Sequence, residues 1–285
     1  MTTEMKPYEH GEAIEKGKLF TFDMEISTYP DKRMRTIRVW LPEDYDGVKR
    51  FPVVYMHDGQ QLFRGLDDAP KQDLDRAVTS LAPYGISAIV VGIDNAENRG
   101  TELTPPGPRA PEGSVVNGFP VPIIPGESTT PVYAEFIVKY LKPYIDEHFM
   151  TLPDADNTVV GGISAGGSTS YYMILNYPEV FGRAIVCSPG FPMFTLEGML
   201  ADLDAYDFSK LAGHRIAFYN GDESIDVTSL DHVLWVYRKF KEKGFDNRQV
   251  MYLLDTRQSH CDAAWGKYMP ELLKFVLAED NSERV

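Results

Sequence analysis

Asn157-Thr158-Val159-Val160-Gly161, followed directly by Gly162-Ile163-Ser164-Ala165-Gly166, is the stretch that decides the fold. A short apolar run leads into a G-x-S-x-G pattern, and a helix-compatible sequence, GGSTSYYMILNYP, comes next. In this strand–turn–helix setting the pattern predicts a nucleophile elbow, a tight turn that lifts the serine hydroxyl above the sheet edge. Gly162 and Gly166 fit such a turn because a Cβ at either position would collide with neighbouring backbone. The alternative is a glycine-rich turn that merely joins a strand to a helix.

Apolar runs of the length of a buried strand recur on both sides of this stretch. Segments with helical spacing lie between them, and Pro143 is expected to kink or restart one of these helices. This alternation predicts an α/β fold with a mostly parallel central sheet flanked by helices. No linker divides the chain, so residues 1–285 are expected to form a single domain. The expected strands are Met34–Leu41, Phe51–Met56, Ile86–Gly92, Thr158–Gly161, Arg183–Cys187, Arg215–Tyr219 and Val250–Leu254, and the helical segments lie around 74–81, 132–145, 233–240 and 272–277.

The composition disfavours several classes of protein. The 285 residues include 28 Lys plus Arg against 42 Asp plus Glu, and the net charge of −14 disfavours binding to nucleic acid or to an anionic membrane surface. The two cysteines, Cys187 and Cys261, cannot form a disulfide framework or a four-sulfur zinc site. The N-terminal residues lack the pattern of a secretory signal, and no apolar run approaches the roughly 20 residues of a membrane helix. We therefore expect a cytoplasmic protein.

Residues 98–131 interrupt the alternation of strands and helices. The segment reads NRGTELTPPGPRAPEGSVVNGFPVPIIPGESTTP, is rich in proline and has no periodicity. Loops of this length inside a folded domain usually serve a function or are disordered. The sequence favours an irregular insertion that acts as a substrate-side loop or cap, with a mobile insertion as the alternative.

A serine hydroxyl needs a general base to become nucleophilic, and three histidines follow Ser164. His232 lies inside an amphipathic helical segment, where a packing or surface role is expected. His214 precedes an expected strand, which puts it at the wrong edge of a parallel sheet. His260 follows the strand Val250–Leu254, at the edge where open α/β sheets build their sites. His260 is therefore the predicted base.

The acid that orients this base should follow the strand at 215–220, where the chain reads Gly221-Asp222-Glu223-Ser224-Ile225-Asp226. Any of the three carboxylates could reach the imidazole of His260. Glu223 is the preferred acid, ahead of Asp222 and then Asp226. A solvated acidic loop with only one functional member is equally compatible with the sequence.

Acyl transfer also requires two backbone N–H groups directed at the developing oxyanion. One is expected from Ala165, directly after the nucleophile, and the other from Gln60, in the loop that follows an earlier strand. His57 and Asp58 in the same loop could instead be metal ligands. Because no HExxH pattern or second His–carboxylate pair accompanies them, we expect no metal and predict that both side chains hold the loop through hydrogen bonds.

Further motifs are spread over most of the chain. They are Arg35–Pro42 with Tyr45, Val54–Phe63, Val91–Asn95 with Arg99, Tyr177–Gly182 with Cys187–Gly190, and Ser259-His260 with Trp265. These motifs resemble those of the esterase family of α/β-hydrolases, which includes feruloyl esterases, enterochelin esterase-like enzymes, S-formylglutathione hydrolase and the mycolyltransferases. The resemblance implies an α/β-hydrolase fold with Ser164 as nucleophile and His260 as base. It also implies that Gln60 and Ala165 donate the oxyanion amides.

The resemblance bears on the acid and on the substrate pocket as well. Similar proteins place the acid three residues after a glycine, and Asn220 stands at that position here, which favours Glu223. Gln61 stands where many similar proteins have Asn. Gln61, Trp265 and Phe191 are candidate substrate-binding residues, with ordinary core or cap packing as the alternative for the two aromatic side chains.

Together these residues predict a serine carboxylesterase that hydrolyses a small or carbohydrate-linked ester through an acyl-enzyme on Ser164, without a metal or organic cofactor. The expected partner is a small-molecule ester. No nucleic-acid or membrane partner is expected, and the sequence leaves the oligomeric state open. An acyltransferase with the same site is one alternative, because an alcohol can replace water in deacylation. A catalytically silent binding protein of the same fold is the other.

Overall fold

The central element is a nine-stranded sheet. The structure is a computed structural model, and it describes residues 1–7, 14–63 and 72–278. The strands of this sheet are β1 (Lys6–Pro7), β2 (Lys18–Glu25), β3 (Met34–Leu41), β4 (Val53–His57), β5 (Ile89–Ile93), β8 (Thr158–Ile163), β9 (Arg183–Cys187), β10 (Arg215–Gly221) and β11 (Val250–Asp255). Their spatial order is β1-β2-β3-β5-β4-β8-β9-β10-β11. The strands from β5 to β11 in this order run parallel, and β1 to β3 are antiparallel, so the expected mostly parallel sheet is confirmed.

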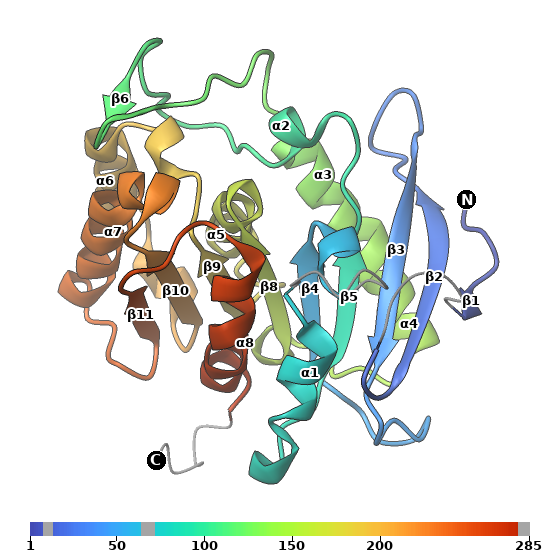
Figure 1. Ribbon diagram of the computed structural model, residues 1–285. Helices are drawn as coiled ribbons and strands as arrows, with labels where there is room; N and C mark the ends of the chain where they lie inside the picture. The colour runs from blue at the N-terminus through green and yellow to red at the C-terminus, as the bar shows by residue number, and fades with distance from the viewer. Residues whose placement is uncertain (8–13, 64–71, 279–285) are drawn as a thin grey trace.

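Helices lie on both faces of the sheet (Figure 1). One apolar cluster joins the sheet to α1 (Leu74–Thr79) and α8 (Asp262–Leu277), and a second cluster joins its other face to the remaining long helices. These are α3 (Thr130–Phe136), α4 (Lys142–His148), α5 (Ala165–Asn176), α6 (Leu196–Ala205) and α7 (Leu230–Glu242). Shorter turns are α2 (Arg99–Glu102), η1 (Gly59–Gln61), η2 (Ala82–Tyr84), η3 (Ile137–Leu141), η4 (Ala155–Asn157), η5 (Phe191–Met193), η6 (Phe208–Leu211) and η7 (Ser224–Thr228).

The helical segment around Pro143 changes its winding just before the proline. The π-helical turn η3 separates α3 from α4, which begins one residue ahead of Pro143. Proline has no N–H to donate to the preceding turn, and a wider turn at this place accommodates the missing hydrogen bond. The helix is continuous from residue 130 to residue 148, so it does not restart at Pro143 as expected, and only its winding changes locally.

The segment 98–131 crosses the edge of the sheet at which the parallel strands end (Figure 1). It begins with α2 and later forms a small hairpin of β6 (Val115–Val116) and β7 (Phe119–Pro120). Hydrogen bonds attach it to distant parts of the chain: the Ala110 N–H donates to the Met193 carbonyl at 2.9 Å, and the Asn117 side chain donates to the Val227 carbonyl at 2.8 Å. These contacts favour the predicted cap over a mobile insertion.

The carboxyl ends of β4, β5, β8, β10 and β11 meet at this same edge, since these strands are parallel. Open α/β sheets bind their ligands there. Over the described part of the chain, no helix combines the length and the apolar character that crossing a bilayer requires.

Candidate active site

Ser164 occupies the turn between β8 and α5. Its backbone has φ 58° and ψ −123°, a sparsely populated conformation that costs on the order of 1–3 kcal/mol and that the surrounding structure must impose. A Cβ on Gly162 would lie 2.5 Å from the carbonyl carbon of Gly166, so glycine is required there as predicted. At Gly166 the predicted clash with backbone is wrong, because the atom nearest to an added Cβ is the side-chain Cβ of His57, at 3.2 Å.

The start of α5 directs free donors toward this turn. Ala165 is the first residue of the helix, and the first N–H groups of a helix have no carbonyl partner within it. The carbonyl of Ser164 accepts hydrogen bonds from the N–H groups of Ser168 at 3.2 Å and Gly190 at 3.1 Å, which fix the turn. The positive end of the helix dipole therefore lies beside the serine hydroxyl.

His260 lies in the loop between β11 and α8, and its Nδ1 is 2.6 Å from Oδ1 of Asp226. The Asp226 side chain is almost completely buried, with an exposed fraction of 1%, whereas the imidazole keeps 18%. His260 and Ser164 line the same two cavities. The other two candidates lie elsewhere: the Nε2 of His232 faces the Phe194 carbonyl at 3.1 Å, and the Nε2 of His214 faces the Pro178 carbonyl at 2.9 Å.

The carboxylate beside His260 is therefore Asp226, and the preference for Glu223 is wrong on geometry. The turn η7 folds the chain back after Glu223, which is exposed, and returns Asp226 to the end of β10. There the N–H of Gly221 donates to Asp226 Oδ2 at 3.1 Å. Asp222 supports the neighbouring loop instead, because its carboxylate accepts a 2.5 Å hydrogen bond from the Arg257 N–H.

Two side chains that the sequence did not assign to the triad orient Asp226. The Ser188 hydroxyl donates to Asp226 Oδ2 at 2.8 Å, and the indole N–H of Trp265 donates to the Ser188 oxygen at 3.0 Å. The ring of Trp265 also meets that of His260 edge to face, at 4.8 Å between centroids. Because Oδ2 accepts from the Ser188 hydroxyl and the Gly221 N–H, Oδ1 is left to accept from His260 Nδ1, and this arrangement fixes the imidazole.

The loop after β4 is held by an ion pair between the buried carboxylate of Asp58 and the partly exposed guanidinium of Arg99. Asp58, which has φ 58°, accepts hydrogen bonds from Arg99 Nε at 2.7 Å and from the Asn95 amide at 2.5 Å. Burial raises the pKa of Asp58, but the hydrogen bond and charge of Arg99 outweigh it and keep the pKa below its usual value. Gly59 packs on β5, where an added Cβ would lie 2.7 Å from the Gly92 carbonyl carbon. These contacts place Gln60 in η1, beside the end of β4.

His57 forms the inner end of this loop. Its Nδ1 lies 2.9 Å from the Tyr133 hydroxyl, and burial lowers the pKa of His57 to about 4. The imidazole is therefore neutral at physiological pH. The predicted role of His57 and Asp58 in holding the loop by side-chain hydrogen bonds agrees with these contacts.

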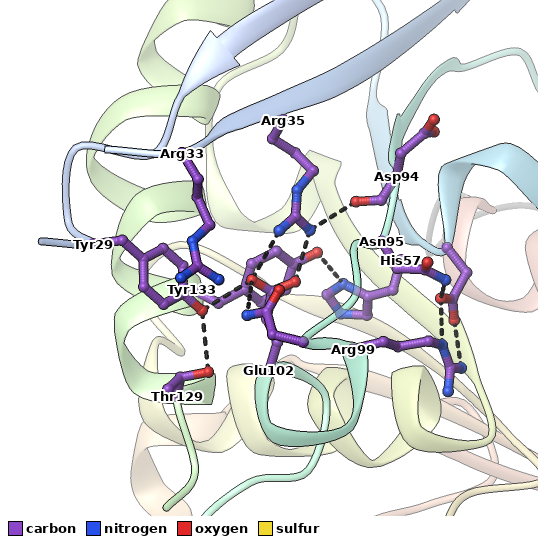
Figure 2. Close-up of polar contacts among 12 residues, drawn as sticks. Tyr29, Arg33, Arg35, His57, Asp94, Asn95, Arg99, Glu102, Thr129 and Tyr133 are labelled. Carbon is purple, nitrogen blue, oxygen red and sulfur yellow. Dashed lines mark hydrogen bonds and ion pairs between the residues drawn. The ribbon is translucent and has the colours of Figure 1, made fainter. Parts of the chain in front are cut away.

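A buried ion pair joins α2 to β3 (Figure 2). Glu102 of α2 accepts hydrogen bonds from both terminal nitrogens of Arg35, at 2.6 and 2.9 Å, and from the Tyr29 hydroxyl at 2.9 Å. Arg35 also donates to the Asp94 carbonyl at 2.8 Å. Since α2 carries both Glu102 and Arg99, this short helix connects strand β3 to the 57–61 loop.

Two cavities open on either side of Ser164. An apolar cavity of about 270 Å³ is lined by residues 119–122 of the cap, by residues 188–193 except Phe191 and by Ile225. A polar cavity of about 380 Å³ is lined by Asp58, Gln61, Asn95, Arg99 and Trp265. The predicted substrate-binding residues Gln61 and Trp265 thus lie at the site. Phe191 does not, because its side chain lines a separate cavity.

Comparison with known proteins identifies the family. Residues 27–273 match the Esterase family, described as "Putative esterase". The chain belongs to the esterase family. A curated relative, the uncharacterized protein YjcH of Bacillus subtilis (strain 168), is 25% identical over 234 residues, which is 80% of each chain. The family assignment makes this esterase a carboxylic ester hydrolase by class.

Solved structures similar to this esterase have the α/β-hydrolase fold. The ferric enterobactin esterase of Salmonella typhimurium has a TM-score of 0.65 at 17% identity, over 95% of this chain and 59% of that protein, so the esterase spans little more than half of the Salmonella enzyme. A ferulic acid esterase has a TM-score of 0.62 at 15% identity, over 92% of this chain and 98% of that protein. At these identities the likeness shows the fold.

The described residues of the esterase contain no group of three or more His, Cys, Asp or Glu side chains placed to hold a metal ion. Asp58 is neutralised by Arg99 and His57 faces Tyr133, so neither side chain is arranged as a ligand. Cys187 and Cys261 are both free thiols, and burial raises the pKa of Cys187 well above its usual value.

Proposed function

We propose that this chain hydrolyses carboxylic esters through an acyl-enzyme on Ser164, with His260 as the base and Asp226 as the acid that orients it. The observation that carries the proposal is the 2.6 Å contact between His260 and the buried Asp226, beside a serine held in a strained turn. A strained backbone at the serine, and a base that lines the same cavities and is oriented by a buried carboxylate, are the features of an activated nucleophile.

In the acylation step, His260 Nε2 takes the proton of Ser164 as Oγ attacks the ester carbonyl. The amides of Gln60 and Ala165 stabilise the oxyanion of the tetrahedral intermediate. His260 then protonates the leaving alcohol. In deacylation His260 removes a proton from water as the water oxygen attacks the acyl carbonyl, and it returns that proton to Ser164 Oγ as the acyl–oxygen bond breaks and the carboxylic acid leaves. Asp226 keeps its charge throughout and stabilises the imidazolium.

The two cavities differ in polarity, which supports a substrate whose acyl part is apolar and whose alcohol part is polar. The apolar cavity, walled by cap prolines, Met193 and Ile225, suits the acyl part. The polar cavity, with the Asp58–Arg99 pair, Asn95 and Gln61, suits an alcohol part that is rich in hydroxyl groups, such as a sugar. This division supports the small or carbohydrate-linked ester expected from the sequence.

The test is the release of p-nitrophenol from p-nitrophenyl acetate by purified protein. Ser164→Ala should lower kcat by at least about 10⁴-fold, because the nucleophile is lost. A fluorophosphonate should label Ser164 of the wild-type chain, as read by peptide mass spectrometry. Ser170→Ala is the matched control, since this serine lies in the helix that follows Ser164 and its hydroxyl donates to the Gly166 carbonyl. Retention of activity by the Ser164 variant, or labelling at another residue, contradicts the proposal.

A further inference from the structure

The apolar cavity at Ser164 offers few hydrogen-bond donors to an acyl group. Among the described residues that line it there is no Lys, Arg, Asp or Glu, and His260 is the ionisable side chain. The N–H groups of Val121, Gly190 and Met193 already donate to main-chain carbonyls, at 2.9, 3.1 and 3.1 Å. Four lining residues are prolines and have no N–H to donate: Pro120, Pro122, Pro189 and Pro192.

The hydroxyl side chains of this wall, apart from the nucleophile, have their protons engaged as well. Ser188 donates to Asp226 Oδ2 at 2.8 Å. Thr228 donates to a carbonyl within η7 at 2.7 Å, and Ser229 donates to the Pro189 carbonyl at 2.8 Å. Each hydroxyl has one proton, so none of the three is left to donate to a substrate. A carbonyl or carboxylate group on the acyl chain would therefore lose its hydrogen bonds to water in this cavity without replacing them.

The cap hairpin forms one wall of the cavity and is fixed to another. β7 supplies wall residues, and the turn that precedes it is Asn117-Gly118, with φ 51° and 85°. Positive φ at both positions is what a two-residue type I′ hairpin turn requires, and Asn-Gly is a preferred pair for it. The Asn117 amide donates to the Val227 carbonyl of η7 at 2.8 Å, and η7 itself lines the cavity with Ile225 and Thr228. One hydrogen bond therefore holds two parts of the wall at a fixed distance.

The volume of the cavity limits the size of the acyl chain. A cavity of about 150 Å³ accommodates benzene, with its six carbons, so by the same ratio the 270 Å³ at Ser164 accommodate about ten carbons. Each methylene that moves from water into apolar surroundings stabilises the bound ester. Affinity for the acyl chain should therefore rise with its length until the cavity is filled.

We propose that this cavity selects an unsubstituted aliphatic acyl chain of up to about ten carbons, and that Asn117 is the positioning residue that holds the cap hairpin in place for it. The inference rests on the function proposed above, because it requires an ester bound at Ser164. It names the substrate class as esters of medium-chain aliphatic acids, in preference to acetyl esters and to acyl groups that carry a charge or a carbonyl group.

The first experiment compares p-nitrophenyl esters of increasing acyl length on the purified full chain. We expect kcat/KM to rise by at least about tenfold from acetate to octanoate, because six methylenes are added to an apolar cavity. Dodecanoate should bring no further gain, since its last carbons exceed the volume available. A matched pair then tests the shortage of donors: kcat/KM for the 5-oxohexanoate ester should be about tenfold or more below that for 5-methylhexanoate, which has a methyl group in place of the carbonyl oxygen.

The second experiment tests the hairpin. Asn117→Asp replaces the amide with a carboxylate, which cannot donate to the Val227 carbonyl but still tolerates a left-handed backbone. We expect KM for the octanoate ester to rise about two- to tenfold, the range for one neutral hydrogen bond, while kcat and the acetate kinetics stay unchanged. Asn117→Gly, which removes the amide without adding charge, should act alike. Asn176→Asp is the matched control, because this exposed amide also donates to a main-chain carbonyl, that of Tyr172 at 2.9 Å, away from both cavities at Ser164.

The outcomes separate this inference from the proposed function. If hydrolysis depends on Ser164 but is no faster for octanoate than for acetate, or is equal for the oxo and methyl esters, the selection of an unsubstituted chain is overturned while the proposed function stands. If both Asn117 variants keep the wild-type KM for octanoate, or Asn176→Asp raises it equally, the role of the hairpin is overturned. A wild-type chain that hydrolyses none of these esters contradicts the proposed function and this inference together.

Discussion

The two sides of Ser164 hold their carboxylates in different ways. Asp226, on the His260 side, is held by neutral donors, the Ser188 hydroxyl and the Gly221 N–H. Asp58, on the side of the 57–61 loop, is paired with the guanidinium of Arg99. A carboxylate held by neutral donors keeps its charge available to stabilise an imidazolium, whereas one paired with arginine has its charge offset and serves to fix backbone. The first arrangement suits catalysis, and the second suits the positioning of oxyanion donors.

The largest expected effect comes from removing the charge on the His260 side. In Asp226→Asn, the amide oxygen should face the donors Ser188 and Gly221, which leaves the NH₂ group toward His260 Nδ1. The imidazole then carries its proton on Nε2 and cannot accept that of Ser164. We expect kcat for p-nitrophenyl acetate to fall by about 10⁴-fold, the cost of the wrong tautomer.

Glu223→Gln and Asp222→Asn are the matched controls, because they remove equivalent charges within four residues of Asp226. Both should keep kcat within a few-fold of wild type, since Glu223 is exposed and Asp222 bonds the Arg257 N–H. A loss of kcat in Glu223→Gln comparable to that in Asp226→Asn would show that Glu223, the acid favoured by the sequence, belongs to the triad.

Much of the fold follows from local sequence. The buried strands β3 and β9 have the bounds that their apolar runs predict, and Gly244, with φ 95°, lies just after the end of α7. The prediction missed β2, although its buried Phe22 and Met24 alternate with Asp23, because the segment is short of β-branched residues. Ser164 directly follows β8 and His260 lies in the short loop after β11, and the apolar runs of the sequence show both strand ends.

The identity of the acid, and the side-chain pairs that hold the site, depend on tertiary contacts that the local sequence does not report. Asp226 reaches His260 because a 3₁₀ turn reverses the chain after Glu223, and spacing from a glycine does not report that reversal. Ser188 and Trp265 meet across 77 residues, and Arg35 and Glu102 across 67. Such pairings are set by the tertiary arrangement of strands. Phe191 was a candidate substrate-binding residue in the sequence, and only the structure shows that it lines a cavity separate from the two at Ser164.

The second largest effect should come from the buried ion pair between Arg35 and Glu102. Glu102 and Arg35 have exposed side-chain fractions of 0% and 2%, so Glu102→Gln leaves a buried guanidinium without its countercharge. We expect the free energy of unfolding to fall by about 3–5 kcal/mol, as measured by urea denaturation at pH 7. Asp31→Asn is the control, because Asp31 pairs with Arg33 at the surface, and it should leave the midpoint unchanged. A small loss in Glu102→Gln would show that packing, and not charge, holds this side of the site.

A smaller effect, on how the free energy of unfolding depends on pH, is expected from His57. Its pKa is about 4 in the folded chain, against about 6.5 when unfolded, because burial disfavours the charged ring. Between these values the unfolded state binds the proton and the folded state does not, so stability falls as the pH is lowered from 7 toward 4. From pH 7 to pH 5 this amounts to about 2 kcal/mol for one group.

His57→Gln removes this titration and can keep a polar contact with Tyr133. Urea denaturation of both proteins at the two pH values gives the comparison, and the wild-type chain should lose about 2 kcal/mol more than the variant between pH 7 and pH 5. Equal losses in the two proteins would mean that His57 does not stay neutral in the folded state.

The smallest expected effect shows which of the two cavities at Ser164 holds the acyl group. Ile225 lines the apolar one and is 47% exposed, so truncation to Ala removes little buried surface. We expect Ile225→Ala to raise KM about two- to fourfold for p-nitrophenyl butyrate and to leave KM for the acetate unchanged, with kcat unaffected, because the lost contact is made equally in ground and transition states. Gln61→Ala, in the polar cavity, should leave the ratio of butyrate to acetate KM at its wild-type value. If Gln61→Ala changes that ratio and Ile225→Ala does not, the acyl group occupies the polar side, and the two halves of the proposed substrate exchange places.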